Sequence, residues 1–196
     1  KFGKFDAKKT VRTLADAMKS NIPSMSKELY EDLAKNESWE KKNMELYMDA
    51  IAKCAVLYRD KKIIIRPHPA EDIKVWKDFV KSLGKKNVQI ITSGDSVIPW
   101  LLASYKTISH NCTTSLESSL MGKKSINYTP LKNDNYEWEI PLLIANTARD
   151  FDSLINFINQ KEHEKSDNEK ISYFIRNYRD KSFCYFSLNV IESLVD

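Results

Sequence analysis

The stretch that decides the fold is "KKIIIRPHPAEDIKVWKDF", residues 61–79. Three β-branched apolar residues run directly into Arg66, two prolines and His68, and a charged segment with helical spacing follows. A short apolar run that ends in a polar turn before a helix is typical of a buried strand in a parallel α/β sheet. Ligands bind to such sheets beyond the carboxyl ends of the strands. The polar residues after this strand are therefore candidates for a binding site.

Four short apolar runs of this kind recur along the middle of the chain. They are "KIIIR" (62–66), "VQIIT" (88–92), "KTISH" (106–110) and "KSINY" (124–128). The segments between them are predicted to be helices, at 72–83, 96–104 and 113–121. Strands that alternate with single helices indicate a parallel sheet wound by right-handed crossovers. We therefore expect one sheet of at least four strands, with helices on both faces and Trp76 partly buried beneath one of them.

Helices are predicted on both sides of this core. Residues 1–59 are predicted to form a helical lead-in. Apolar residues at 11, 14, 15 and 18 are predicted to share one helix face. A serine cap at Ser24 or Ser26 is predicted to open a helix that continues to about Arg59. Residues 149–196 are predicted to close the domain with a helix at "RDFDSLINFINQ", a polar break and a long helix from about 171 to 194.

Composition limits the class of protein. The formal net charge is +4, with acids and bases mixed along most of the chain, which is too mild for a nucleic-acid-binding protein. The three cysteines, Cys54, Cys112 and Cys184, are far apart and form no CxxC pair, so we expect a reduced, intracellular protein. No Asp-x-Asp and no pair of histidine or cysteine ligands at a usable spacing occurs, so no metal is expected.

The ends of the sequence and its hydropathy give two further expectations. No run of about 18 apolar residues could cross a bilayer, and the first ten residues lack the apolar core of a secretory signal, so we expect a soluble protein. The chain begins with lysine, and those residues are typical of neither a translation start nor a strand. We therefore expect a piece of a longer chain.

The polar turn "RPHP" follows the first predicted strand. Two prolines bracket His68 and hold it and Arg66 in extended conformations, because proline fixes its own backbone and restricts the residue before it. The turn is then a rigid mount for a cation and an imidazole. The alternative is a strand that simply ends at a proline, with a surface histidine.

The third predicted strand ends in "TISHNCTTSLESSLMGKK", residues 107–124. Asn111 and the hydroxyls of Thr113, Thr114 and Ser115 come where a helix is predicted to begin. Free backbone N–H groups and the helix dipole favour an anion there, so we expect a phosphate-binding site. It contains no glycine-rich phosphate motif. Ordinary helix capping, for example by Thr113, is the alternative.

Together with "GDSVIPWLLAS", these stretches resemble the carboxyl-terminal, nucleotide-sugar-binding half of bacterial surface carbohydrate biosynthesis proteins, glycosyltransferases of the GT-B architecture. Similar "HP" and serine/threonine motifs occur in capsule Kdo transferases, sialyl- and polysialyltransferases, and CDP-glycerol polymerases. The resemblance covers about residues 60–145 and implies a Rossmann-like nucleotide-binding core at 60–148. It also implies that the phosphate of a cytidine nucleotide is held by the matching residues, which are His68, Pro69, Thr113, Thr114 and Ser115.

The chemistry of a CMP- or CDP-activated donor fits the same residues. The departing phosphate gains negative charge, which Arg66 and His68 could stabilise. We expect backbone groups of Val97, Ile98, Pro99 and Trp100 to line the base pocket, although core packing of this segment is the alternative. Glu117 would reach a ribose hydroxyl or form a capping box with Thr114. His110 ends an apolar strand and is kept as a candidate beside a structural role.

The sequence also lacks parts that such an enzyme needs. A GT-B enzyme takes its acceptor, and usually its general base, from the other half, and nothing before residue 62 has that pattern. The acidic stretch "NYEWEIP", residues 135–141, has carboxylates for which the sequence identifies no partner. We therefore expect a chain that binds a nucleotide sugar, without another cofactor, and does not catalyse transfer without the missing amino-terminal half.

The expected location is the cytoplasm, with attachment to the inner membrane face as an open alternative. Two other functions remain: half of a GT-B-like sugar-nucleotide epimerase, whose usual arginine and glutamate constellation is not evident, and a noncatalytic interaction domain. In the second of these, the "HP" and threonine motifs would be structural.

Overall fold

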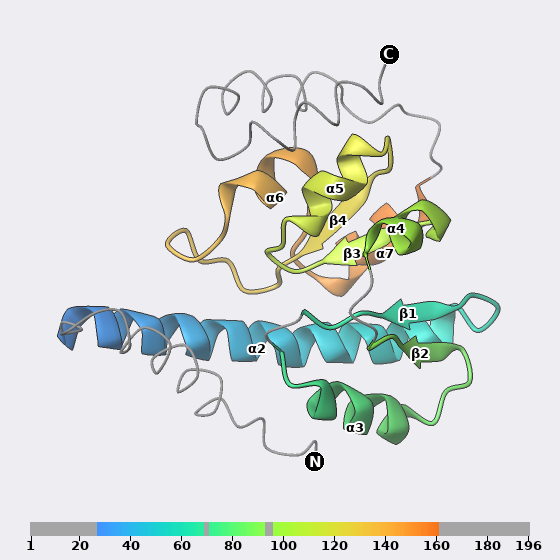
Figure 1. The fold of residues 1–196 in the computed structure, drawn as a ribbon, viewed down its shortest axis with the longest axis horizontal. Coiled ribbons are helices and arrows are strands. Elements are labelled where there is room, and N and C mark those ends of the chain that lie inside the picture. The colour runs from blue at the N-terminus through green and yellow to red at the C-terminus, as the bar shows by residue number, and fades with distance from the viewer. Residues whose placement is uncertain (1–26, 69–70, 93–95, 161–196) are drawn as a thin grey trace. The chain divides into compact units, whose positions relative to one another are not determined.

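The computed structural model describes residues 27–68, 71–92 and 96–160 (Figure 1). The chain divides into two compact units, one before and one after the boundary between residues 95 and 96. This boundary lies inside the 60–148 core that we predicted from the sequence. The helices predicted within 1–26 and after 160, the serine caps, Pro69 and Cys184 lie outside the described residues.

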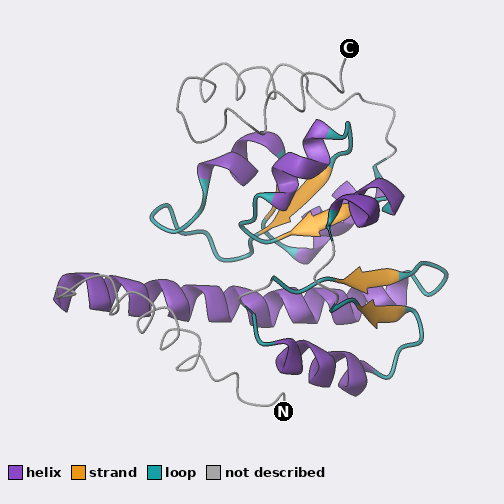
Figure 2. Cartoon of the chain, viewed as in Figure 1, coloured by secondary structure: helices purple, strands orange, loops and turns teal. Residues whose placement is uncertain are grey.

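The described residues of the first unit form one long helix and a β-α-β segment (Figures 1 and 2). Its elements are α2 (Lys27–Leu57), β1 (Ile63–Ile65), α3 (Ile73–Leu83) and β2 (Val88–Ile90). The two strands pair in parallel, with Ile63 opposite Val88 and Ile65 opposite Ile90. The predictions of two strands with a helix between them, and of a helix ending near Arg59, are confirmed.

The core of the first unit is apolar. Its buried residues come from all four elements and are Met48, Ala55, Ile65, Trp76, Phe79 and Val88. The rings of Trp76 and Phe79 meet edge to face, with centroids 6.1 Å apart. Trp76 is 4% exposed, so it is buried more completely than predicted.

Two local features fix the ends of the helices in this unit. Asn87 donates hydrogen bonds from Nδ2 to the carbonyl oxygens of Ala55 (3.2 Å) and Tyr58 (3.1 Å), which satisfies carbonyl groups at the end of α2. Gly84 ends α3 with a φ of 57°, a left-handed conformation that glycine adopts without strain. Helix α3 can therefore turn directly towards β2.

The second unit is a three-layer arrangement of short elements around a parallel sheet (Figure 1). Its elements are α4 (Ile98–Ala103), β3 (Thr107–Ser109), α5 (Thr114–Leu120), β4 (Ser125–Tyr128), α6 (Glu139–Ile144), β5 (Asn146–Ala148) and α7 (Phe151–Asn159). The strand order is β3-β4-β5, with both pairs parallel. The two predicted strands and the three predicted helices are confirmed.

Strand β5 and helix α6 were not predicted. The β5 sequence "NTA" has no apolar run, and the six residues of α6 include a proline, so neither carries a periodic signal. Pairing with the fully buried β4 is what makes residues 146–148 a strand. Tertiary contacts therefore decided an element for which local propensity is weak.

The sheet differs from the prediction in one respect. We expected one sheet of at least four strands, whereas the ladders form two parallel sheets, β1-β2 and β3-β4-β5. Each strand is only three or four residues long, so each pairing is made by few backbone hydrogen bonds. The coarser prediction, a mixed α/β fold with parallel strands and intervening helices, is confirmed and is compatible with a Rossmann-like fold.

Helix α2 is long enough to span a bilayer but carries charged residues along its length. Among the described residues, no helix combines the necessary length with the necessary apolar character.

Candidate functional site

The turn after β1 is organised by Glu71, which sequence reasoning overlooked. Its carboxylate oxygen Oε2 accepts the backbone N–H of His68 (3.0 Å) and the indole N–H of Trp76 (2.8 Å). The backbone N–H of Glu71 in turn donates to the carbonyl of His68 (2.9 Å). The buried Trp76 thus fixes the backbone of His68, while the His68 side chain is exposed. Glu71 thus holds the backbone of His68, and the predicted contribution of the prolines stays a prediction because Pro69 lies outside the described residues.

Arg66 and the start of α3 complete this strand end. Arg66 is partly buried, and its Nη1 atom is inaccessible to solvent. Asp72 caps α3 by accepting the backbone N–H of Lys74 (2.8 Å). The guanidinium of Arg66 and the imidazole of His68 therefore follow β1, with Glu71 bonded to the His68 backbone and Asp72 capping the next helix.

The turn after β3 is organised by Asn111. Its φ is 45°, a left-handed conformation that asparagine tolerates better than most residues. The backbone N–H of Asn111 donates to Asn127 Oδ1 (2.9 Å), its Nδ2 donates to the carbonyl of Tyr136 (2.9 Å), and its Oδ1 accepts the N–H of Trp138 (2.6 Å). Asn111 was predicted as a phosphate ligand, but the structure gives both ends of its amide backbone partners.

The three predicted hydroxyl ligands occupy different environments. Thr113 is exposed and makes no side-chain capping bond, and Thr114 is partly exposed with Oγ1 3.2 Å from Cys112 Sγ. Ser115 is completely buried, and its hydroxyl is 2.8 Å from that of Ser109. The predicted cluster of three is therefore corrected to two accessible hydroxyls, because the third residue of the turn points into the core.

Glu117 was predicted to contact a ribose or to form a capping box with Thr114. Helix α5 begins at Thr114 with Thr113 as its N-cap, so Glu117 is the fourth helical residue and not the third. Its backbone N–H bonds to the carbonyl of Thr113 (3.3 Å), and no side-chain bond caps the helix. The capping box is thus absent at α5, and the ribose contact stays a prediction.

The predicted base pocket at Val97–Trp100 is the first turn of α4. The N–H of Ile98 donates to Ser96 Oγ (3.2 Å), the N–H of Trp100 donates to the carbonyl of Val97 (3.0 Å), and Pro99 has no N–H. The adjoining Leu101 is buried. The N–H groups of Ile98 and Trp100 are therefore used by neighbouring residues of the same chain segment, which limits the expected recognition of a base through its backbone.

His110 was kept as a candidate beside a structural role. Its Nδ1 lies 3.1 Å from the carbonyl oxygen of Tyr128, at the end of the adjacent strand β4. Since a carbonyl only accepts, this contact requires the proton on Nδ1. The geometry supports the structural role.

The acidic stretch 135–141 has the partner that the sequence did not identify. Both carboxylate oxygens of Glu137 accept hydrogen bonds from Arg149, which also donates to the carbonyl of Thr129 (3.0 Å). The Glu137 side chain is 2% exposed. Its hydrogen bonds, together with its charge, raise the pKa of Arg149 above the usual value, against the opposing effect of burial. The pair joins the loop before α6 to the end of β5, an element that we did not predict.

The two motifs belong to different units, His68 to the first and Thr113 and Thr114 to the second. Their convergence on one phosphate stays a prediction. No group of three histidine, cysteine or carboxylate side chains that could hold a metal ion occurs in the part of the chain that the structure describes. Comparisons of the chain with protein-family models, with curated proteins and with solved structures find no match.

Proposed function

We propose that this chain is the donor-binding half of a GT-B glycosyltransferase for bacterial surface polysaccharide, and that it binds a CMP- or CDP-activated sugar. One observation carries the proposal. The two polar motifs follow the carboxyl ends of parallel strands, β1 and β3, each of which leads through a helix to its parallel neighbour. Parallel α/β folds bind their ligands at these ends.

The chemical types at the two strand ends suit a phosphate. Arg66 is permanently cationic, and the exposed His68 can donate hydrogen bonds to an anion. Thr113 and Thr114 add hydroxyl donors that are at least partly accessible. Negative charge builds up on the nucleotide phosphate as the sugar leaves, so these groups would bind the transition state more tightly than the ground state.

The proposal assigns this chain donor binding and not turnover. The acceptor site and the general base belong to an amino-terminal half, which is the expected protein partner. The proposed location is the cytoplasm, with attachment to the inner membrane face as the alternative. Nucleic acid is not a proposed ligand.

Calorimetric titration with CMP, CDP, UDP and GDP tests the proposal. Binding of the cytidine nucleotides alone is the expected result, and transfer of sugar by this chain alone would contradict it. Binding of UDP alone would favour a GT-B-like epimerase. No binding by any of the four nucleotides would favour a noncatalytic domain.

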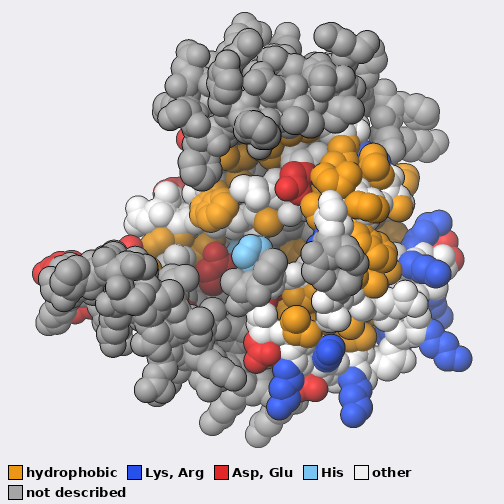
Figure 3. Space-filling view, in the orientation of Figure 1, with side chains coloured by type: hydrophobic (Ala, Val, Ile, Leu, Met, Phe, Trp, Pro, Cys, Tyr) orange, Lys and Arg blue, Asp and Glu red, His pale blue; other side chains and the backbone are white. Residues whose placement is uncertain are grey.

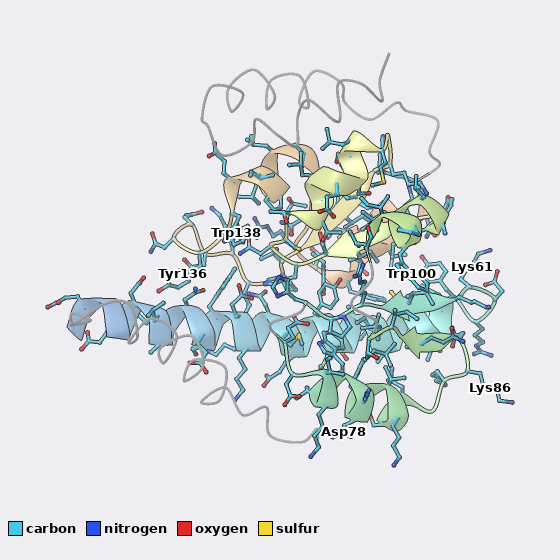
Figure 4. The ribbon with its side chains drawn as sticks, in the orientation of Figure 1. Lys61, Asp78, Lys86, Trp100, Tyr136 and Trp138 are labelled. Carbon is cyan, nitrogen blue, oxygen red and sulfur yellow. The ribbon has the colours of Figure 1, made fainter. Side chains whose placement is uncertain are left out.

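His68→Ala should weaken cytidine nucleotide binding by about 1.5 to 3 kcal/mol, the range for a charge-assisted hydrogen bond. Lys86→Ala is the matched control, because it removes an exposed cation close before the start of β2, at the opposite end of the same sheet (Figure 4). Equal affinity of wild type and His68→Ala would refute the assigned role.

The threonines give a second, smaller test of the proposal, at the strand end that follows β3. Thr113→Val and Thr114→Val should each cost about 1 kcal/mol of binding if one hydroxyl contact is lost. Neither variant should unfold the protein, because neither side chain belongs to the buried core. Full affinity in both variants would remove the β3 strand end from the site.

The noncatalytic interaction domain is the second candidate function. The observation in its favour is that three motif residues have structural partners: Asn111 with the loop before α6, His110 with Tyr128, and Ser115 with Ser109. The titration separates the two functions, because a purely structural motif predicts no nucleotide binding.

A further inference from the structure

We propose that the exposed indole of Trp138 is the surface on which the pyrimidine base of the bound nucleotide stacks. This inference rests on the proposed function and names the group that recognises the base. Trp138 is 53% exposed although it is a large aromatic residue. It lies at the end of the loop that leads from β4 to α6 (Figure 4).

The backbone that carries this indole is held at three consecutive residues. Asn111 accepts the N–H of Trp138 and donates to the carbonyl of Tyr136, while the side chain of Glu137, between them, is bound to Arg149. A fixed backbone reduces the conformational entropy that binding would otherwise cost. The exposed ring is therefore presented from a rigid segment.

The same contacts hold the Trp138 backbone beside the turn after β3, which carries the hydroxyls. Asn111, which bonds to the Trp138 backbone, precedes Thr113 by two residues, and helices α5 and α6 pack against each other. Trp138 and the two accessible threonines are thus presented at neighbouring helix starts within one unit. A phosphate at the threonines would place the rest of a nucleotide beside this loop.

The other tryptophans and the predicted base pocket are less suited to recognising the base. Trp39 and Trp76 are buried, and the N–H groups of Ile98 and Trp100 are used by Ser96 and Val97 at the start of α4. Stacking on an indole needs no backbone donor, because it uses the face of the base. Hydrophobic side chains do reach the surface elsewhere (Figure 3), but Trp138 combines an aromatic face with an anchored backbone.

The test uses the full chain, with Trp138→Ala and the control Tyr105→Ala. Tyr105 is similarly exposed, at 59%, but it precedes the start of β3 and so lies at the opposite end of the sheet. The bond from the Trp138 backbone to Asn111 does not need the indole, so Trp138→Ala should fold, which an unchanged circular dichroism spectrum and melting temperature would show.

Calorimetry with two probes separates stacking from phosphate binding. For CMP, Trp138→Ala should lower the affinity between about 5-fold and about 150-fold, the range that corresponds to stacking of one base. For ribose 5-phosphate, which has no base, the affinity should not change. Tyr105→Ala should bind both probes like the wild type, and Trp138→Phe should recover most of the CMP affinity because it restores an aromatic face.

Tryptophan fluorescence gives an independent readout. CMP should quench the emission of the wild type and fail to quench Trp138→Phe, whereas Trp100→Phe should still respond. If CMP binds the wild type and Trp138→Ala equally, the inference is wrong while the proposed function stands. Equal losses for CMP and ribose 5-phosphate would also overturn stacking. No binding of cytidine nucleotides to the wild type would overturn both proposals.

Discussion

The two units differ in what they bury. The first unit buries mainly apolar residues, such as Ile65, Trp76 and Phe79, and its described residues include one buried polar side chain, Asn43. The second unit buries apolar residues too, but it also buries a set of small polar residues: Ser109, Ser115, Ser118, Ser119, Ser125, Asn127 and Thr129. The stability of the first unit should therefore be most sensitive to a loss of buried side-chain volume. The stability of the second unit should also be sensitive to a loss of buried hydrogen bonds.

The small polar residues buried in the second unit are explained by how helix α5 packs against the sheet. Ser115 on this helix meets Ser109 on β3, and the hydroxyl of Ser125 on β4 donates to the carbonyl of Ser115 (3.3 Å). Small side chains let a helix approach a sheet closely, and buried hydroxyls such as these three then bond to protein partners because water is excluded, whereas the buried Ser118 hydroxyl has no such partner among the described residues. The difference teaches that a hydroxyl-rich turn can supply the core with buried hydrogen bonds, apart from any ligand proposed for it.

The largest effect is expected for Trp76→Ala, which tests the apolar core. Removing a buried indole leaves a cavity and should lower the free energy of unfolding by about 3 to 5 kcal/mol. Urea unfolding followed by circular dichroism measures the change. Ile73→Ala, on the same helix but 38% exposed, is the control and should cost much less. Similar losses for both variants would contradict the described core.

The next effect tests the ion pair of the second unit. Glu137→Gln keeps the shape of the side chain but removes the charge that Arg149 binds, and should cost about 1.5 to 3 kcal/mol of unfolding free energy. The control is Asp134→Asn in the same loop, because its pair with Lys132 is exposed and should contribute less than about 1 kcal/mol. Equal stability of Glu137→Gln and wild type would show that the pair does not hold the loop.

A double-mutant cycle tests the buried hydroxyl pair. Ser109→Ala and Ser115→Ala should each cost about 1 kcal/mol or more, since each leaves the other hydroxyl buried without its partner. The double variant should be more stable than the sum of the two losses predicts, because no unsatisfied member of the pair remains. Strictly additive losses in urea unfolding would argue against this hydrogen bond.

The smallest effect concerns the start of α7 and depends on pH. Asp150 accepts the backbone N–H of Ser153 (2.7 Å) and its hydroxyl, and these bonds hold the pKa of Asp150 below its ordinary value. The ionised form therefore stabilises the folded state at pH values above about 3.9, the unfolded pKa. This stability is lost as the pH falls through the lower folded pKa.

Asp150→Asn removes that titration while keeping a side chain that can cap a helix. Melting temperatures of the variant and the wild type should differ slightly at pH 7, and the difference should be smaller at pH 3. A difference that does not change between the two pH values would rule out the titration of Asp150 as its cause.

Much of the fold could be predicted from local sequence patterns. β-Branched runs marked β1, and the polar turns that follow β1 and β3 were located correctly. Asp72 and Asp150 cap two of the predicted helices, and aspartate is a residue type that commonly caps helices. These features depend on neighbours along the chain, which is why a single sequence contains them.

The sequence by itself determined the parallel α/β class and the place of both motifs at strand ends. Only the tertiary structure decided which motif residues remain accessible, because that depends on partners distant in sequence. Asn111 is used by the loop before α6, Ser115 by β3, and Glu137 by Arg149 after an unpredicted strand. A serine, threonine or asparagine reads the same in the sequence whether its side chain binds a ligand or lies in a core. Only the residues that pack against it in the folded chain distinguish the two cases.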